Sequence, residues 1–208
     1  MSKTKVLNLY AGIGGNRKLW TDVDVTAVEW DEEKAEVYAD HFPQDELVIA
    51  DAHEFLLDHF QEFDFVWASP PCPTHSDFRR LMHQQDNPKY PDMKLWQEII
   101  LLQHTYTGDY CVENVIPYYD PLIDGQRRAR HMFWSNFHIP EIELESDGVK
   151  RQDSSWQEIQ ARYEYDLSGY DKSKTWKRKV LNNCVHPRLG KHVFESRTTQ
   201  DTLPGVEL

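Results

Sequence analysis

The sequence is poor in cysteine, and its three cysteines are neither even in number nor closely spaced. Cys72, Cys111 and Cys184 therefore indicate reduced thiols rather than a disulfide framework. No group of cysteines and histidines has the spacing of a zinc finger, so we expect no metal site. No apolar run approaches the ~20 residues that a membrane span requires, so we expect no membrane segment.

Basic residues are also scarce. The chain has 23 lysines and arginines against 35 aspartates and glutamates, which gives a formal net charge of -12. Because nonspecific affinity for a duplex comes largely from neutralised phosphates, this charge opposes strong binding to nucleic acid. The basic residues do cluster, since residues 172–194 contain seven of them and no acid. This run is either a local basic face on an acidic body or an ordinary solvated surface.

The N-terminus lacks the apolar region of a signal peptide, because the apolar run at residues 6–10 is short and leads directly into a glycine-rich turn. We therefore expect a cytoplasmic protein, and so compact a chain suits a prokaryotic or phage-infected cell. Its 208 residues predict one domain with at most a small appendage, and they are enough to bury a core.

Short β-type runs alternate with helical segments in the first half of the chain. The predicted strands are Val6–Tyr10, Val23–Val28, Leu47–Ala50, Phe63–Ala68 and Tyr110–Val112. The predicted helices begin with Gly15–Trp20 and continue with Asp31–His41, Ala52–Phe60 and Pro91–Thr105. This alternation predicts a mostly parallel sheet with helices on both faces. Ligands of such sheets bind outside the carboxyl ends of the strands.

Polar or glycine-rich motifs follow the first three predicted strands. Glu29 and Trp30 follow the second strand, where an acid can meet ribose hydroxyls and a ring can stack on adenine. Asp51 follows the third strand and has the plainer interpretation of a helix N-cap. Together these motifs favour one adenosine-type ligand. The turn after the first strand consists of Tyr10, Ala11, Gly12, Ile13, Gly14 and Gly15, whose glycines permit close approach of a ligand.

The fourth and fifth predicted strands lead to residues with catalytic chemistry. Cys72 stands between Pro71 and Pro73, which present it rigidly, as a nucleophile requires. A lone cysteine is otherwise an inert small hydrophobe. Glu113 provides a carboxyl group that can hydrogen-bond the edge of a base. The arginines at positions 128 and 130 point to one face if that segment is extended.

In this order, the motifs resemble those of the DNA cytosine-C5 methyltransferase family. The resemblance spans residues 6–194 and ends in the Asn-Asn-Cys-Val-His-Pro-Arg-Leu-Gly-Lys sequence at 182–191. The order disfavours amino-methyltransferases, which share the cofactor fold but need neither the cysteine nor Glu-Asn-Val. The matching motifs are Tyr10–Gly15, Glu29-Trp30, Asp51, Pro71-Cys72, Glu113-Asn114-Val115 and Gln126-x-Arg128-x-Arg130.

The resemblance implies an α/β fold, the Rossmann-like fold of methyltransferases that use S-adenosyl-L-methionine. It also implies that the Cys72 thiolate adds to C6 of a cytosine flipped out of duplex DNA. Glu113 would hydrogen-bond N3 and the exocyclic amine, and Arg130 with Arg128 would stabilise O2. The implied cofactor-binding residues are Tyr10, Ala11, Gly12, Ile13, Gly14, Gly15, Glu29, Trp30, Asp51, Pro71, Asn183 and Val185. The implied nucleic-acid contacts are Ser76, Arg79, Arg80, Lys177 and Arg178, with residues 74–94 as a loop that closes over the base.

The sequence departs from the family pattern near the nucleophile and in its length. Pro73 and His75 occupy positions that usually hold glutamine and an aromatic residue, and Asn8 stands where an acid is common. Only about 45 residues lie between the arginines and the C-terminal motif, where the family normally has a large target-recognition region.

We therefore expect a catalytic and cofactor-binding domain at residues 1–136. We also expect a reduced target-recognition segment at residues 137–181. The C-terminal motif at 182–208 should pack back on the catalytic domain. The short segment leaves other functions open. An active enzyme could methylate DNA or RNA, and a protein partner or an oligomer could supply recognition. Alternatively, the chain is a non-catalytic subunit.

Overall fold

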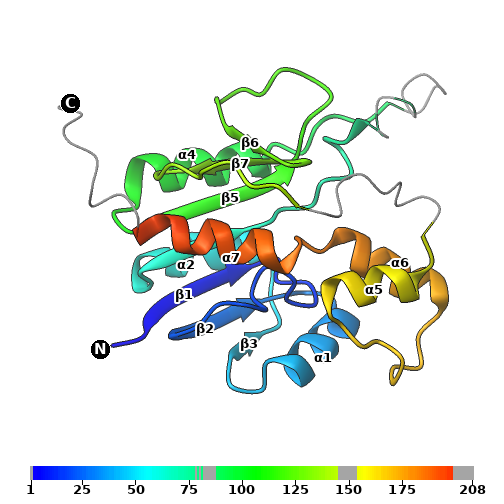
Figure 1. Cartoon of the computed structure of the whole chain (residues 1–208). Helices are drawn as coiled ribbons and strands as arrows, with labels where there is room; N and C mark the ends of the chain where they lie inside the picture. The colour runs from blue at the N-terminus through cyan, green and yellow to red at the C-terminus, as the bar shows by residue number, and fades with distance from the viewer. Residues whose placement is uncertain (1, 78, 80, 82–87, 145–153, 199–208) are drawn as a thin grey trace.

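The computed structural model describes residues 2–77, 79, 81, 88–144 and 154–198. At its centre is a seven-stranded sheet in the order β3-β2-β1-β4-β5-β7-β6 (Figure 1). Strands β1 to β5 pair in parallel, and β7 and β6 add an antiparallel edge. The mostly parallel sheet predicted from the sequence is confirmed. The strands are β1 (Thr4–Leu9), β2 (Val23–Val28), β3 (Glu46–Val48), β4 (Phe65–Ala68), β5 (Asp109–Val115), β6 (Gln126–Arg128) and β7 (His131–Ser135).

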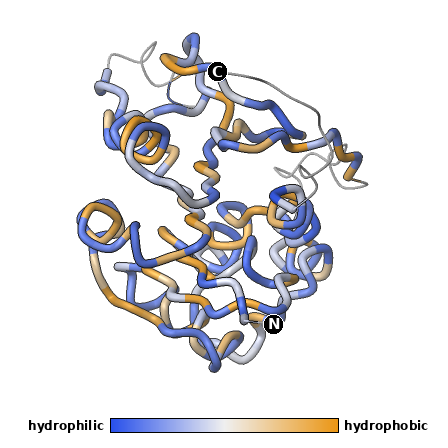
Figure 2. Tube along the Cα trace, turned by 90° about the vertical axis from the view of Figure 1, so that its left-hand side faces the viewer, coloured by the Kyte–Doolittle hydropathy of each residue, from blue (hydrophilic) through white to orange (hydrophobic). Residues whose placement is uncertain are grey.

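Helices cover both faces of the sheet, as predicted. On one face lie α1 (Glu32–His41) and α7 (Pro187–Ser196), and on the other lie α2 (Ala52–His59) and α4 (Lys94–Thr105). The 3-10 turn η1 (Phe60–Glu62) follows α2. The hydrophobic residues of these elements (orange in Figure 2) form two buried clusters, one on each side of the sheet. None of the helices within the described residues is long and apolar enough to cross a bilayer.

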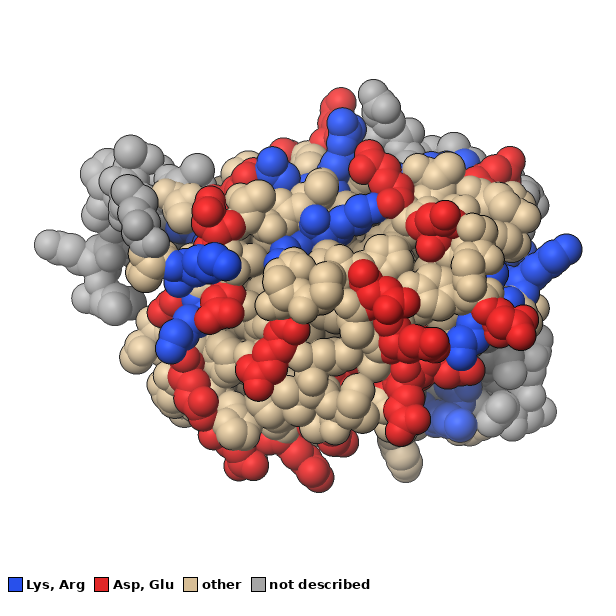
Figure 3. All heavy atoms as spheres, turned by 90° about the horizontal axis from the view of Figure 1, so that it is seen from below, with Lys and Arg blue, Asp and Glu red and all other residues tan. Residues whose placement is uncertain are grey.

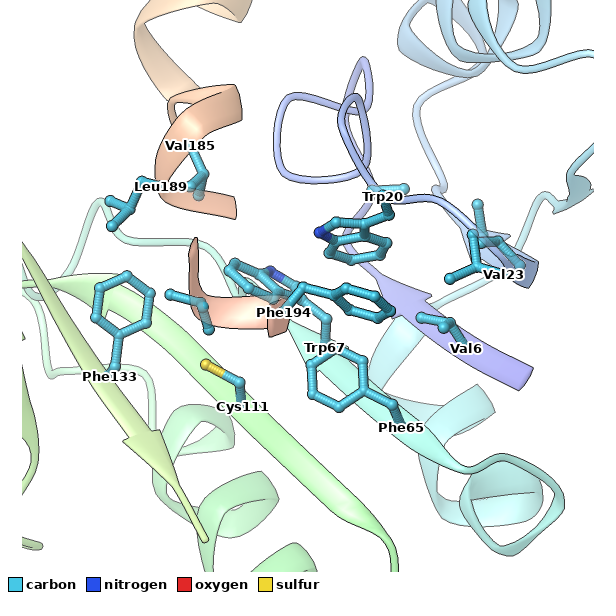
Figure 4. Packing of buried hydrophobic residues seen from close by; sticks show 14 of the residues in the cluster. Val6, Trp20, Val23, Phe65, Trp67, Cys111, Phe133, Val185, Leu189 and Phe194 are labelled. Carbon is cyan, nitrogen blue, oxygen red and sulfur yellow. The ribbon is translucent and has the colours of Figure 1, made fainter. Parts of the chain in front are cut away.

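The apolar core is divided by the sheet because successive strand residues face opposite sides. In β1, Val6 belongs to the cluster under α7, whereas Leu7 belongs to the cluster under α4. The Trp20 ring stacks on Phe194 of α7 with ring centroids 5.0 Å apart. Cys111 is fully buried in the same cluster (Figure 4). Phe194 also contacts the Phe65 ring of β4 edge-on, so aromatic packing holds α7 against β4 and the segment before β2, although α7 lies near the opposite end of the chain.

The predicted helix at Gly15–Trp20 is wrong, because this segment forms consecutive turns. Its polar side chains are tied to distant residues. The Asn16 amide donates to Asn8 at 2.7 Å, and the Arg17 guanidinium binds the Asp45 carboxylate at 2.8 and 3.0 Å. These contacts replace the helical hydrogen bonds, which a six-residue segment sustains poorly by itself. The other predicted elements are present, with ends shifted by at most three residues.

A small unit made of α5 (Trp156–Tyr163) and α6 (Lys174–Asn183) packs against the N-terminal half of the chain. The Tyr165 hydroxyl donates to the Ile13 carbonyl at 2.8 Å, and Lys172 pairs with Glu33 of α1 at 3.0 Å. The described part of the predicted target-recognition segment is therefore held against the glycine-rich turn and α1. Its use in target recognition stays a prediction.

Candidate active site

The glycine-rich turn lies at the carboxyl end of β1, beside the end of β2. Its backbone is left-handed at Tyr10, Gly12 and Gly14, with φ of 56°, 59° and 83°. A Cβ added to Gly14 would lie 2.2 Å from the Phe42 ring, whereas one added to Gly12 would meet no atom closer than 4.0 Å. Gly14 is therefore required by packing. Gly12 borders open space that a ligand can approach closely.

The Glu29 carboxylate, which follows β2, is buried against this turn. One oxygen accepts from the Gly12 amide at 2.9 Å, and the other accepts from the Asp31 amide at 2.9 Å. Because a carboxylate accepts about four hydrogen bonds, Glu29 retains capacity for ribose hydroxyls. The neighbouring Trp30 is 73% exposed, so its ring is open for stacking. The open space at Gly12, this acceptor and this ring fit an adenosine-type cofactor.

Asp51 caps the N-terminus of α2, where its side chain accepts from the His53 amide at 2.8 Å. Its carboxylate also lies 3.4 Å from the Lys94 ammonium group. Burial opposes ionisation here, but the His53 amide and Lys94 outweigh it and lower the pKa of Asp51. Asp51 is thus an N-cap, about half of its side chain is exposed, and its contact with a cofactor stays a prediction.

A buried carboxyl group on α4 adjoins this region and was not expected from the sequence. The Tyr10 hydroxyl donates to Glu98, and the His53 Nδ1 atom lies 2.9 Å from the same oxygen. Burial raises the pKa of Glu98, and these partners oppose that rise. The sequence did contain a clue, because Glu98 falls on the same helical face as Leu95, Ile99 and Leu102.

The connection between α6 and α7 touches the glycine-rich turn from the other side. A Cβ on Gly15 would lie 2.6 Å from the Val185 carbonyl oxygen. Asn183 is the exposed last residue of α6, and Pro71 is exposed ahead of Cys72. The structure therefore brings Val185 to the turn, and the cofactor contacts of Asn183 and Pro71 stay predictions.

Cys72 lies beyond the end of β4 and is half-buried. Its carbonyl accepts from the His75 amide at 3.0 Å and from the Ser76 amide at 3.2 Å, which closes a tight turn after the thiol. Burial raises the pKa of the Cys72 thiol, the charge of Glu113 raises it further, and Arg130 opposes both. The structure thus brings Cys72, Glu113 and Arg130 within electrostatic reach of one another.

Glu113 is a buried carboxylate near the end of β5. Its Oε1 atom lies 2.5 Å from Nδ1 of His131, the first residue of β7. Burial by itself favours the protonated form, but His131, the Ser69 hydroxyl and Arg130 outweigh it and lower the pKa of Glu113. His131 was not expected from the sequence, although it directly follows the arginine motif. The carboxylate is therefore ionised and held by neighbouring strands.

The condition for the two arginines to share one face, an extended segment through Arg130, is not met. Strand β6 ends at Arg128, and Ala129 adopts a left-handed φ of 53°, which breaks the extended alternation. The buried Arg128 guanidinium donates to the Ile139 and Pro140 carbonyls and pairs with Glu141 at 3.1 Å. Its donors are thereby occupied by the segment after β7, which indicates a structural role. Arg130 remains the candidate for the base.

His75, one of the departures from the family pattern, is buried beside the nucleophile. Its Nδ1 atom lies 2.6 Å from the Tyr119 hydroxyl, and its carbonyl accepts from the Tyr118 amide at 3.0 Å. Burial lowers the pKa of His75, which favours the neutral ring. The imidazole thus fills the aromatic position while anchoring the turn after Cys72.

The predicted nucleic-acid contacts are placed very differently. Ser76 and Arg79 are half-buried in the turn and segment after Cys72, and Arg80 lies outside the described residues. Lys177 is buried, with its ammonium group 4.8 Å from the centre of the Trp156 ring, and this placement opposes a phosphate contact, which stays a prediction. Arg178 is half-buried on α6. On the face drawn in Figure 3, the described acidic side chains interrupt the basic ones, so no continuous basic surface forms there.

A sequence model of the family described as C-5 cytosine-specific DNA methylase matches residues 4–116. The matched region contains the glycine-rich turn, Glu29, Asp51, Cys72 and Glu113. A comparison with curated proteins finds no match. Within the described part of the chain, no three histidine, cysteine, aspartate or glutamate side chains gather as metal ligands.

Several solved structures are similar over part of the chain. A DNMT2 from Spodoptera frugiperda is 24% identical with a TM-score of 0.38, over 54% of this chain and 36% of that one. TrmN from Thermus thermophilus is 20% identical with a TM-score of 0.35, over 53% and 33% of the chains. A SAM-dependent methyltransferase from Agrobacterium tumefaciens is 11% identical with a TM-score of 0.38, over 56% and 40%. The matched part of this chain spans about a third of the length of the first two proteins.

Proposed function

Because the chain belongs to the C-5 cytosine-specific DNA methylase family, whose methyl donor is S-adenosylmethionine, we propose that it methylates C5 of cytosine in DNA. One observation carries this proposal. The Cys72 thiol, the Glu113 carboxylate and Arg130 lie close enough for each charge to alter the pKa of the thiol. Addition to a cytosine requires three groups close together. They are a nucleophile, an acceptor for the edge of the base and a cation.

The residues around the glycine-rich turn would hold the methyl donor. Gly12 leaves space for it, Glu29 accepts hydrogen bonds from its ribose, and Trp30 stacks on its adenine. S-adenosylmethionine supplies an electrophilic methyl group when bound. The chain itself orients the base beside that group and activates C5.

Cys72 would activate the base by forming a bond between its sulfur and C6. The thiol first loses its proton to solvent. As the sulfur–C6 bond forms, the electrons of the C5–C6 double bond shift into the C4–C5 bond and those of the C4–N3 double bond shift to N3, which takes up a proton from solvent. Glu113 would accept a hydrogen bond from this N3–H, Arg130 would bind O2, and N3 returns its proton when the ring is restored. After methylation, C5 loses its proton, the sulfur–C6 bond breaks and the aromatic ring is restored. The thiolate must approach the face of the ring, so the base has to leave the stack of a duplex.

Methyl transfer from radiolabelled S-adenosylmethionine to DNA and to RNA tests this function. We expect label in DNA with the wild-type protein and with Cys184→Ser, and none with Cys72→Ser. Cys184 is a matched control because it is buried outside the base site, with its thiol 3.2 Å from the Val180 carbonyl. Label in RNA alone would replace the DNA substrate by RNA. Failure to label either nucleic acid would favour a non-catalytic subunit.

A further inference from the structure

The Glu113–His131 pair lies close to Cys72, and its histidine has no role in the steps proposed above. Its side chains are 9% and 8% exposed, and the Oε1 and Nδ1 atoms are 2.5 Å apart. Glu113 of β5 is directly opposite Phe133 of β7, so His131 is its diagonal neighbour in the sheet. Hydrogen bonds of the two strands therefore fix the relative positions of these side chains.

A second donor, Ser69, reaches the same carboxylate from the residue that directly follows β4. The Trp67 indole N–H donates to the Ser69 hydroxyl oxygen at 2.8 Å, which leaves the Ser69 proton available for Glu113. Because a carboxylate only accepts, Nδ1 of His131 must carry the proton between the two residues. The other ionisable groups that face Glu113 are Cys72, Cys111 and Arg130, of which only Arg130 adds positive charge.

Resting on the proposed function, we propose that His131 is a positioning residue for base recognition. Its Nδ1–H fixes Glu113 as an oriented carboxylate that accepts from the C4 amine of cytosine and rejects the C4 carbonyl of uracil or thymine. The carboxylate oxygen of Glu113 and the C4 carbonyl oxygen of uracil or thymine are both acceptors, so they repel each other. Because both groups would be buried without a hydrogen-bond partner, the discrimination between the bases is strong. His131 thus contributes to the choice of base without touching it.

Alkylation of Cys72 tests the pair without any substrate. The negative charge of Glu113 raises the pKa of Cys72. In His131→Leu, Glu113 loses the partner that most favours its charged form, so burial raises its pKa, its average charge falls and the pKa of Cys72 falls with it. We expect iodoacetamide to modify Cys72 about 3- to 10-fold faster at pH 7, since one pKa unit is a factor of ten. Mass spectrometry separates this site from the buried Cys111 and Cys184.

Two further variants separate positioning from a loss of packing. Glu113→Gln should accelerate alkylation as His131→Leu does, and the double variant should react no faster than Glu113→Gln alone. His131→Gln keeps an N–H donor and should remain near the wild-type rate. Unchanged alkylation in His131→Leu would overturn the proposal. So would an acceleration that persists in the Glu113→Gln background, because it would report loosened structure.

Base discrimination tests the specificity directly, on whichever nucleic acid the wild-type protein methylates. We expect His131→Leu to lose about 10- to 100-fold in kcat/KM. Fluorescence anisotropy should also show a smaller ratio of affinities for nucleic acid with cytosine and with uracil at the target position. His131→Gln should restore part of kcat/KM and part of this ratio. Full retention of that preference in His131→Leu would contradict the proposal. If the wild-type protein methylates nothing, the proposed function fails, while the alkylation series still decides whether His131 controls Glu113.

Discussion

At the scale of single residues, the surroundings of Cys72 favour the protonated thiol, although the proposed reaction requires the thiolate. Burial and the Glu113 charge both raise the pKa of its thiol, and Arg130 only partly compensates. The thiol is therefore protonated in the free protein at neutral pH. An amine of a bound base that donates to Glu113 would reduce the repulsion between the carboxylate and a thiolate. We expect the nucleophile to become reactive mainly when the base is in place.

The nucleophile is identified by trapping with a nucleic acid that contains 5-fluorocytosine. Fluorine at C5 cannot leave as a proton does, so the bond between Cys72 and C6 should persist and survive denaturing electrophoresis. We expect peptide mapping to place the adduct on Cys72 and Cys72→Ala to form none. An adduct on Cys111 or Cys184 would contradict the mechanism, since both are buried.

The cofactor site is tested at Glu29. Glu29→Ala removes the acceptor of two ribose hydroxyls, and a buried partner lost in this way costs about 1–3 kcal/mol. Calorimetry should therefore show roughly 5- to 150-fold weaker binding of S-adenosylmethionine. Glu32→Ala, an exposed acid in the first turn of α1, is the matched control and should bind normally. Unchanged affinity in Glu29→Ala would remove this residue from the site.

At the scale of elements, turns replace the helix that the sequence predicted after β1. Asn16 and Arg17 are drawn inward by Asn8 and Asp45, which belong to β1 and to the segment before β3. The unit of α5 and α6 then covers this turn through the Tyr165–Ile13 hydrogen bond. The glycine-rich turn is thus supported by parts of the chain about 150 residues apart.

Two glycines of the turn should respond differently to alanine. Gly14→Ala places a methyl group within 2.2 Å of the Phe42 ring at a left-handed φ, so we expect unfolding in urea to show a loss of about 2–4 kcal/mol. Gly12→Ala meets no neighbour and should lose only about 1–2 kcal/mol. It should nevertheless weaken S-adenosylmethionine binding, because the methyl group enters the space left for the cofactor. Equal cofactor affinity in Gly12→Ala and wild type would show that the cofactor lies elsewhere.

At the scale of the whole molecule, charge limits how nucleic acid can bind. The net charge is -12, and several basic residues of the 172–194 run already have partners. Lys172 pairs with Glu33, Lys191 pairs with Glu195 at 3.5 Å, and Lys177 lies over Trp156. Fewer cations therefore remain for phosphates than the sequence suggested. This favours weak binding, a short or degenerate target, or a partner that supplies recognition.

The salt dependence of DNA binding measures this limit. Each phosphate contact contributes about −0.9 to the slope of log affinity against log salt, so a few contacts predict a slope of about −2 to −4. Arg79→Ala should make the slope shallower by about one, and Lys172→Ala should leave it unchanged. Bisulfite sequencing of DNA from expressing cells should show methylation at sites of only a few bases. A slope steeper than about −6, or a long defined site, would show that the chain reads DNA more extensively.

Much of the fold was accessible from the sequence because its signals are local. Alternating apolar runs and glycines predicted the parallel sheet, and polar residues after each strand predicted where a site would lie. The sequence did not predict His131 and Glu98, because their partners lie elsewhere in the chain. His131 pairs with Glu113 on the neighbouring strand, and Glu98 accepts from Tyr10 at the end of β1. The one local sign of Glu98 was an acidic residue at a position on the apolar face of a predicted helix.

The sequence by itself determined the succession of strands and motifs along the chain, and with it the family, because these depend on residue types at local spacing. Only the tertiary structure decided which charged side chains share a site. Arg128 and Lys177 are both cations, but Arg128 donates to backbone carbonyls and Lys177 lies over an aromatic ring. Arg130 keeps its influence on Cys72 and Glu113 because Ala129 turns the chain between the two arginines. Side-chain direction and burial arise only when the strands pair, so charge alone could not assign these roles.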